Sequence, residues 1–257
     1  MSQIVIYEKK GRVACITLNR PEVLNALDLE IRQQLKELFL QIEADDGIGC
    51  IFISGAGRSF SAGGDVKTMG GYRSGGGRKR LINMHQMIKA LALSDKPSIA
   101  AVHGFVAGAG LSLALACDMR LASANAKFVA SFLNVGLAPD SGSFYFLPRI
   151  VGMAKAKELV LRPQPIKADE ALSIGLVNHV FDEESFEEKA FAIAEDISSR
   201  PALAVSLSKT ILNRSFEMSL DEALDFEAMA QDICFQSDEH VEGIKAFNEK
   251  RKPRFNQ

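Results

Sequence analysis

Two glycine-rich turns, at residues 60–65 and 104–110, are the parts of this chain whose residue types and spacing could do chemistry. Each follows an apolar run typical of a buried strand. Glycine lets a main chain approach a ligand closely and adopt positive φ. A turn that opens into a helix directs unpaired N–H groups and the positive end of the helix dipole outward. Two such turns, brought together, could each donate one N–H to the same oxygen, which predicts an oxyanion hole for acyl chemistry.

The composition of the 257-residue chain is that of an ordinary globular protein, with 47% hydrophobic and 24% charged residues. The formal net charge of −2 gives no global electrostatic case for binding nucleic acid or an anionic membrane surface. Cys15, Cys50, Cys117 and Cys234 match no metal-ligand spacing. We therefore expect buried, reduced thiols in a cytoplasmic protein.

Residues 99–117 carry no charge and are long enough to suggest a membrane-spanning helix. Three glycines and His103 interrupt the run, however, and it is a single span. A buried strand, a turn and a buried helix explain the same residues better, so we expect no contact with a membrane.

The hydrophobic periodicity predicts α/β units over the first two-thirds of the chain and helices over the last third. A hairpin is expected at residues 4–8 and 12–18, and a helix at 29–44 with Asp28 as its N-cap. Further strands are expected at 49–54, 98–103, 119–123 and 176–181, and further helices at 79–93, 109–117, 143–150, 153–161, 167–174, 184–199, 202–215, 219–235 and 238–250. The glycine-rich residues 70–77 are expected to shape a binding pocket.

The two turns and their order in the chain resemble the crotonase, or enoyl-CoA hydratase/isomerase, superfamily. The matching groups of residues are 18–27, 60–66, 97–118, 136–152, 168–177 and 242–251. The resemblance implies an α/β fold: a crotonase-like spiral of ββα units over residues 1–195, and a helical trimerisation region over 196–257. It also implies a homotrimer, or a homohexamer built from two trimers.

By the same resemblance, the substrate is an acyl-CoA thioester, coenzyme A is part of that substrate, and neither a separate cofactor nor a metal is needed. The oxyanion donors are expected to be the main-chain N–H groups of Gly64 and Ala109, which would stabilise an enolate. The family more often has glycine at the second position, but alanine keeps the N–H. In a purely structural alternative, the glycines only allow close packing of strand and helix.

The acid/base group distinguishes the members of this family. The resemblance implies that hydratases add water with two glutamates, and the corresponding residues here are Ser112 and Phe132. Neither residue suits proton transfer. Asp140 lies in the turn where isomerase members place a carboxylate, and the surrounding stretch looks most like a phenylacetate-pathway isomerase that rearranges a ring-epoxide CoA thioester. It is also similar to Δ3,Δ2-enoyl-CoA isomerases.

The leading hypothesis is therefore an isomerase that moves a double bond with Asp140 as the acid/base. The alternatives are an enoyl-CoA hydratase with rearranged acid/base residues, and a homologue that binds acyl-CoA without catalysis. Asp140 could instead act only as the N-cap of the following helix.

Five further residues match positions that contact the CoA moiety in the family. Leu24 would line the adenine pocket, the Ala62 carbonyl would meet the adenine amine, and Gly63 belongs to the same group. Phe247 and Lys250 match C-terminal positions that often reach CoA across a subunit boundary, although Lys250 could equally be a solvated helix end. Asp65 and Asp118 are interpreted as structural residues that brace the glycine turns.

Overall fold

The computed structural model describes residues 3–65, 70 and 76–255, and all structural statements concern these residues. The expectation for the loop at 70–77 falls largely outside them, because residues 71–75 are not described.

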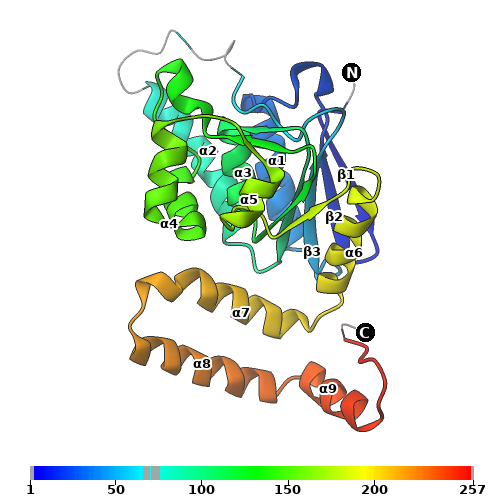
Figure 1. Cartoon of the computed structure of the whole chain (residues 1–257). Coiled ribbons are helices and arrows are strands. Elements are labelled where there is room, and N and C mark those ends of the chain that lie inside the picture. Colours follow the sequence, from blue (N-terminus) through cyan, green and yellow to red (C-terminus); the bar gives the residue numbers. More distant parts are fainter. Residues whose placement is uncertain (1–2, 66–69, 71–75, 256–257) are drawn as a thin grey trace.

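Within the described residues, the main sheet has six strands in the order β1-β2-β3-β4-β6-β9 (Figure 1). β1 (Val5–Lys10) and β2 (Val13–Leu18) form the expected antiparallel hairpin. Every later neighbour is parallel to the strand before it, and these strands are β3 (Cys50–Gly55), β4 (Ser98–Val102), β6 (Met119–Ser123) and β9 (His179–Phe181). Parallel pairing requires crossover connections, which the helices supply.

Both faces of this sheet are covered, so its central strands β3 and β4 are mostly apolar. Side chains alternate along β3, where Ile51 and Ile53 face the larger core and Cys50 and Phe52 face the smaller one. Helix α6 (Phe186–Ser198) covers the smaller core. Helices α1 (Leu29–Glu43), α2 (Gly76–Ala92) and α3 (Gly108–Leu115) contribute to the larger core.

The helix signals in the sequence are local, and the structure confirms them. The N–H of Ile31 donates to Oδ1 of Asp28 at 3.0 Å, so Asp28 caps α1 as expected. The two helices expected near residues 143–161 run on as α4 (Ser143–Leu161), which is interrupted at Gly152, where φ is 76° and ψ is 158°. A short helix, α5 (Ala168–Ser173), precedes β9.

A small second sheet was missed from the sequence. It consists of β5 (Phe105–Ala107), β7 (Lys127–Val129) and β8 (Ile166–Lys167). The stretch at 104–110 was therefore not a simple turn, because β5 separates the glycine at its start from those at its end. The expected strand at 176–181 is likewise shorter and begins at His179. Short strands have little periodicity of their own and depend on distant partners.

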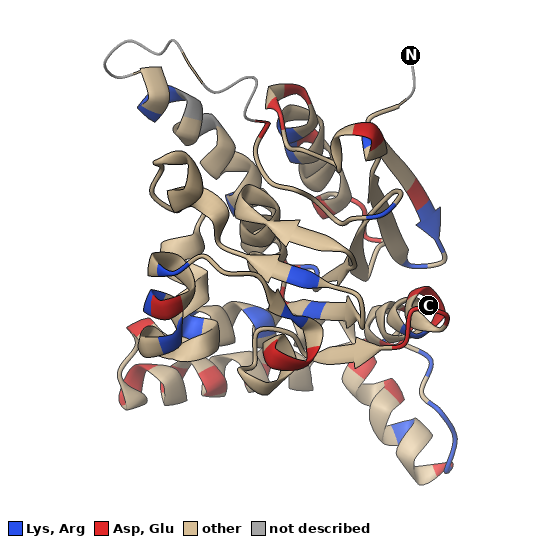
Figure 2. Ribbon diagram, turned by 45° about the horizontal axis from the view of Figure 1, so that its top comes forward, with Lys and Arg blue, Asp and Glu red and all other residues tan. Residues whose placement is uncertain are grey.

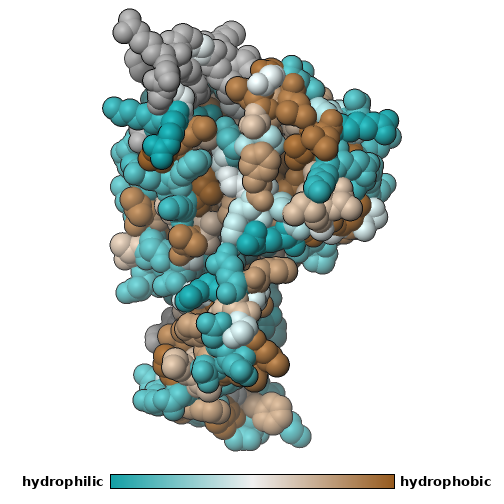
Figure 3. Space-filling view, turned by 90° about the vertical axis from the view of Figure 1, so that its left-hand side faces the viewer, coloured by the Kyte–Doolittle hydropathy of each residue, from teal (hydrophilic) through white to brown (hydrophobic). Residues whose placement is uncertain are grey.

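The last three helices form a separate layer below the sheet (Figure 1). They are α7 (Ala202–Arg214), α8 (Leu220–Phe235) and α9 (Asp238–Asn248), and α8 begins with a capping box between Ser219 and Glu222. The space-filling view shows apolar side chains on this lower lobe (Figure 3). Exposed members of the layer include Leu212, Leu220, Met229, Phe235, Val241 and Phe247. This exposure fits the predicted trimerisation region, and both that role and the division at residue 195 stay predictions.

Charges of both signs are interspersed along the ribbon (Figure 2), in line with the small net charge. None of the described helices combines the length and the apolar character needed to cross a membrane. Residues 99–117 instead form β4, β5, α3 and their connections.

Candidate active site

The two glycine-rich turns lie against each other. Ser61 and Val106 form an isolated parallel bridge. The Ser61 N–H donates to the Phe105 carbonyl at 3.1 Å, and the Ala107 N–H donates to the Ser61 carbonyl at 2.9 Å. Since Ala107 immediately precedes α3, the first turn is fixed beside the N-terminus of this helix.

Gly63 makes the closest approach between the turns. Its φ is +101°, and a Cβ atom at this position would lie 2.8 Å from the Ala107 carbonyl oxygen and 3.3 Å from the Ala109 nitrogen. Glycine is therefore required here by both backbone conformation and space. Because Gly64 follows directly, the structure brings both predicted oxyanion donors, Gly64 and Ala109, into neighbouring segments.

The main-chain N–H groups of Gly64 and Ala109 are both oriented so that they can donate to a ligand. Ala109 is the second residue of α3, so its N–H belongs to the first turn, which has no intrahelical acceptor. Gly64 bridges Leu27 in parallel, and Leu27 donates its N–H to the Gly63 carbonyl at 2.7 Å. In a parallel bridge, Leu27 forms hydrogen bonds with the residues before and after Gly64 and not with Gly64 itself. The N–H of Gly64 therefore points away from Leu27.

Asp140 lies beside the second turn. The Ser112 Oγ is 3.2 Å from the Gly108 carbonyl oxygen and 3.1 Å from the Asp140 carbonyl oxygen. One buried hydroxyl thus connects the start of α3 with the half-buried residue expected to move the proton. The geometry brings the predicted acid/base group and the second turn together.

The capping role considered for Asp140 is wrong. Gly142 is the N-cap residue of α4, and among the described residues no side chain caps this helix. The Asp140 carboxyl oxygen Oδ1 instead accepts a hydrogen bond from the Ser141 hydroxyl at 2.8 Å. The first turn of α4 uses the main chain of Asp140, whose carbonyl accepts from the Ser143 N–H at 3.0 Å.

The two positions where the resemblance placed hydratase glutamates are enclosed. Ser112 is fully buried, and its Oγ lies 2.7 Å from the Ser143 Oγ. Phe132 is only 7% exposed. Position 112 therefore serves as a connection between turns, and position 132 as apolar packing.

The expected CoA contacts divide into two groups. The Ala62 N–H donates to the Leu24 carbonyl at 2.8 Å, so Leu24, Ala62 and Gly63 adjoin the first turn. Phe247 and Lys250 instead lie at the end of α9, in the C-terminal layer (Figure 1). Within one chain the structure does not bring these two residues to the glycine turns.

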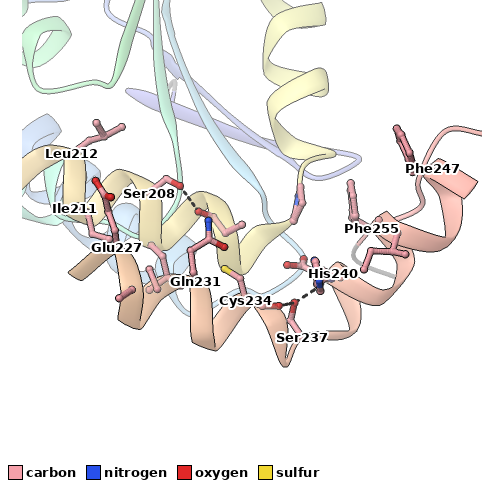
Figure 4. Close-up of a pocket in the computed structure, with 18 of the residues that line it drawn as sticks. Ser208, Ile211, Leu212, Glu227, Gln231, Cys234, Ser237, His240, Phe247 and Phe255 are labelled. Atoms are coloured by element: carbon pink, nitrogen blue, oxygen red, sulfur yellow. Dashed lines mark hydrogen bonds between the residues drawn. The ribbon is translucent and has the colours of Figure 1, made fainter. Parts of the chain in front are cut away.

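Phe247 belongs to a groove between α7, α8 and α9 with a volume of about 1040 Å³. Figure 4 shows Phe247 and Phe255 at one end of this groove and Leu212 at the other. The groove is separate from the two glycine turns, none of whose residues line it.

Asp65 and Asp118 are both held in ion pairs, but the expectation that both brace a glycine turn is correct only for Asp65, whereas Asp118 links the start of β4 to α7. Arg20 Nη1 lies 2.7 Å from Asp28 Oδ2, and Arg20 Nη2 lies 3.7 Å from Asp65 Oδ2, so Arg20 braces the end of the first turn. Asp118 Oδ2 accepts from the Ser98 N–H at 2.7 Å and pairs with Lys209 Nζ at 2.8 Å.

The four cysteines are free thiols, and Cys50 and Cys117 are buried as expected, but the expected burial is wrong for Cys15 and Cys234, which are only partly buried. Burial raises the pKa of Cys117 to about 12, so this thiol is not a nucleophile at neutral pH. Among the described residues, no group of three or more His, Cys, Asp or Glu side chains could hold a metal ion.

Sequence reasoning missed Ser141 and the connecting role of Ser112. Ser141 has a positive φ of 54° and is 1% exposed. The Ser-Gly pair at 141–142 was a usable turn signal. The contacts of Ser112 depend on segments far apart in the chain, and no local pattern reports them.

Known protein sequences are similar to this chain over almost its whole length. A family model described as "Enoyl-CoA hydratase/isomerase" matches residues 8–257. The chain is 41% identical over 249 residues to the short-chain-enoyl-CoA hydratase of Clostridium acetobutylicum, covering 96% of this chain and 95% of the relative. It is 36% identical over 259 residues to the 1,2-epoxyphenylacetyl-CoA isomerase of Escherichia coli, covering 99% and 98%.

Solved structures agree with the sequence relatives. The enoyl-CoA hydratase from Bacillus anthracis superposes with a TM-score of 0.94 at 31% identity, covering 98% of this chain and 99% of that one. A structure titled putative enoyl-CoA hydratase from Streptomyces coelicolor A3(2) also gives 0.94, at 32% identity, covering 99% and 94%. The α/β fold expected from the resemblance is confirmed.

Proposed function

The chain belongs to the enoyl-CoA hydratase/isomerase family and is an enzyme of the crotonase superfamily, and on this basis we propose that it moves a double bond within an acyl-CoA thioester, with Asp140 as the acid/base. The relatives named hydratase and isomerase both act on CoA thioesters by name, which supports an acyl-CoA substrate.

In the proposed reaction, the N–H groups of Gly64 and Ala109 bind the thioester oxygen of a 3-enoyl-CoA. The Asp140 carboxylate removes a proton from the α carbon, and the electron pair delocalises into a dienolate whose negative oxygen lies in the oxyanion hole. The protonated Asp140 then returns the proton to the γ carbon. The double bond has moved by one position, and the enzyme is regenerated.

The observation that carries this proposal is the connection through Ser112. Its hydroxyl contacts the carbonyls of both Gly108 and Asp140, so a carboxylate residue lies next to the helix that supplies the second oxyanion donor. Hydration needs a group to activate water as well, and neither Ser112 nor Phe132 has a carboxylate for it.

Hydration is the second candidate function, because two relatives with high identity carry that name. Besides the Clostridium acetobutylicum enzyme, the crotonyl-CoA hydratase of Syntrophomonas wolfei is 36% identical over 252 residues. In a hydratase, the acid/base residues would be rearranged, and water would be activated from positions other than 112 and 132.

A direct comparison of the two reactions tests the proposal. We expect the wild-type enzyme to isomerise a 3-enoyl-CoA faster than it hydrates crotonyl-CoA. Asp140→Asn should lower isomerisation about 10²- to 10⁴-fold while retaining acyl-CoA binding, because general acid–base catalysis contributes this much. Asp169→Asn, an exposed aspartate of α5, is the matched control.

Faster hydration by the wild type would favour the hydratase. Full isomerase activity in Asp140→Asn would place the base elsewhere, and equal background rates in wild type and Asp140→Ala would indicate a binding protein without catalysis.

We also propose that the enzyme works in the cytoplasm as a homotrimer or a homohexamer, without a metal or a separate cofactor. Support for assembly comes from the exposed apolar side chains of α8 and α9, including Leu220 and Phe247. Light scattering on the purified protein gives the oligomeric state directly, and a monomer at all concentrations would contradict it.

A further inference from the structure

The turn that carries Asp140 has an unusual residue at its first central position. The Ser143 N–H donates to the Asp140 carbonyl, and the two residues between them both have positive φ: 54° at Ser141 and 86° at Gly142. This is the pattern of a type I′ turn, which favours asparagine, aspartate or glycine at both positions. A serine in this conformation is strained.

The strained serine is also buried and bonded to the carboxyl group. Ser141 is 1% exposed, and its Oγ lies 2.8 Å from Asp140 Oδ1 and 3.2 Å from the Met84 sulfur. The hydroxyl has one proton, and an ionised carboxylate accepts it more strongly than a thioether does. The hydroxyl therefore donates to Asp140, with Met84 packed against its other side.

Strain, burial and a hydrogen bond to the acid/base group thus coincide at one residue. Asparagine or glycine would form the same turn with less strain, but glycine has no side-chain donor and asparagine is larger in a space closed by Met84. Strained residues that persist in folded proteins cluster at functional sites.

We propose that Ser141 is a positioning residue for the proton transfer. Its hydroxyl fixes Oδ1 of Asp140 and with it the orientation of the carboxyl plane toward the substrate carbons. The inference rests on the proposed function, in which Asp140 moves the proton. Met84 on α2 and Ser112 on α3 both form hydrogen bonds with this turn, and both side chains are uncharged.

Ser141→Gly is the variant that isolates the hydroxyl, because glycine keeps the positive φ without strain. We expect kcat to fall about tenfold while KM stays within about twofold, since one hydrogen bond to a charged group is lost without loss of a substrate contact. The acidic limb of the pH–rate profile should move to higher pH, because that bond favours the ionised carboxyl group.

Ser94→Gly is the matched control. Ser94 is 5% exposed and its hydroxyl also donates to a carboxylate, that of Glu43 on α1, away from the two turns. We expect its kcat and pH–rate profile to match those of the wild type. Ser141→Ala is a second variant without the hydroxyl, and thermal unfolding of each protein checks that the fold is retained.

A double-mutant cycle separates positioning from a general structural effect. In the Asp140→Asn background, Ser141→Gly should cause no further loss of kcat, because the residue acts through the carboxyl group. Wild-type kcat and pH profile in Ser141→Gly, or an equal loss in both backgrounds, would overturn the inference. If Asp140→Asn itself keeps full activity, the proposed function fails; if it is inactive and Ser141→Gly is normal, only this inference fails.

Discussion

Lys209 on α7 and Asp118, just beyond α3, form an ion pair in which Nζ and Oδ2 are 2.8 Å apart. Lys209 is 8% exposed, and its Nζ also donates to the Lys96 carbonyl at 2.8 Å. Asp118 in turn accepts from both the N–H and the hydroxyl of Ser98, the first residue of β4. One polar cluster therefore attaches the C-terminal layer to the sheet.

Removing the lysine should destabilise the protein. We expect Lys209→Met to lower the free energy of unfolding by about 3 kcal/mol, because a partly buried Asp118 is left without its cation. Urea denaturation measures this loss. Lys157→Met, at an exposed position of α4, is the control and should change stability by less than about 0.5 kcal/mol. A Lys209→Met protein as stable as this control would show that the pair is not stabilising.

The parts of the fold that could be predicted are those with local signals. Asp28, followed by an apolar stripe that includes Ile31, Leu35 and Ile42, identifies α1 from one short stretch of sequence. The small sheet had no such signal, because β5 and β7 have three residues each and pair across a gap in the sequence. Its existence depends on tertiary contacts that sequence periodicity does not contain.

The candidate site divides in the same way. The convergence of the two glycine turns was expected, and the structure shows it in the close approach of Gly63 to Ala109. The resemblance placed Leu24 and Ala62 at one adenine site, and the structure joins them by a main-chain hydrogen bond. The placement of Asp140 beside α3 depends on the Ser112 hydroxyl, which appears in the sequence only as one residue of an apolar helix. Phe247 is expected to reach the CoA site of a neighbouring subunit, and a single chain does not show this contact. Its role therefore stays a prediction.

The oxyanion assignment can be tested at both donors. Gly64→Pro removes one N–H and should lower kcat about 10²- to 10³-fold. Ala109→Gly keeps the N–H, so we expect activity within a few-fold of the wild type. Steady-state kinetics with a 3-enoyl-CoA measures both variants, and thermal unfolding verifies that each is folded. A folded Gly64→Pro enzyme with normal kcat would exclude Gly64 as a donor.

The contact between the turns predicts a strong effect of one methyl group. In Gly63→Ala the added Cβ would lie 2.8 Å from the Ala107 carbonyl oxygen at a φ unsuited to alanine. We expect stability to fall by about 1–3 kcal/mol and kcat to fall at least tenfold, because the second turn must move. Gly11→Ala, at the turn of the β1–β2 hairpin, is the matched control, because its φ is also positive at +58° but nothing lies within 4 Å of the new Cβ, and it should keep wild-type kcat. Equal kinetics in the two variants would contradict the close approach.

The raised pKa of Cys117 predicts its reactivity. Desolvation by burial raises this pKa to about 12, so thiolate is scarce at pH 8. Burial raises the pKa of Cys50 as well. We expect neither thiol to react with a disulfide reagent in the native enzyme, and both to react at once in denaturant. Mass spectrometry of the labelled peptides identifies the sites, and rapid native labelling of either cysteine would show that its surroundings open in solution.

Glu242 on α9 connects this helix to the end of the chain. Arg251 contacts its carboxylate through Nη1 at 2.6 Å and Nη2 at 2.9 Å, and the Arg254 N–H donates to Oε1 at 2.7 Å. The hydrogen bonds from Arg251 and from the Arg254 main chain hold the pKa of Glu242 at about 2, below its ordinary value of 4.5.

A lowered pKa in the folded state means that this contact stabilises the tail above pH 4.5, and that the stabilisation is lost as the pH falls from 4.5 toward 2. The amide resonance of Arg254 should therefore titrate in this acidic window. In Glu242→Gln the same resonance should not titrate there, because no carboxylate remains to be protonated. A wild-type midpoint near 4.5 would mean that the paired arginine does not hold the carboxylate in solution, and that α9 and the tail move independently.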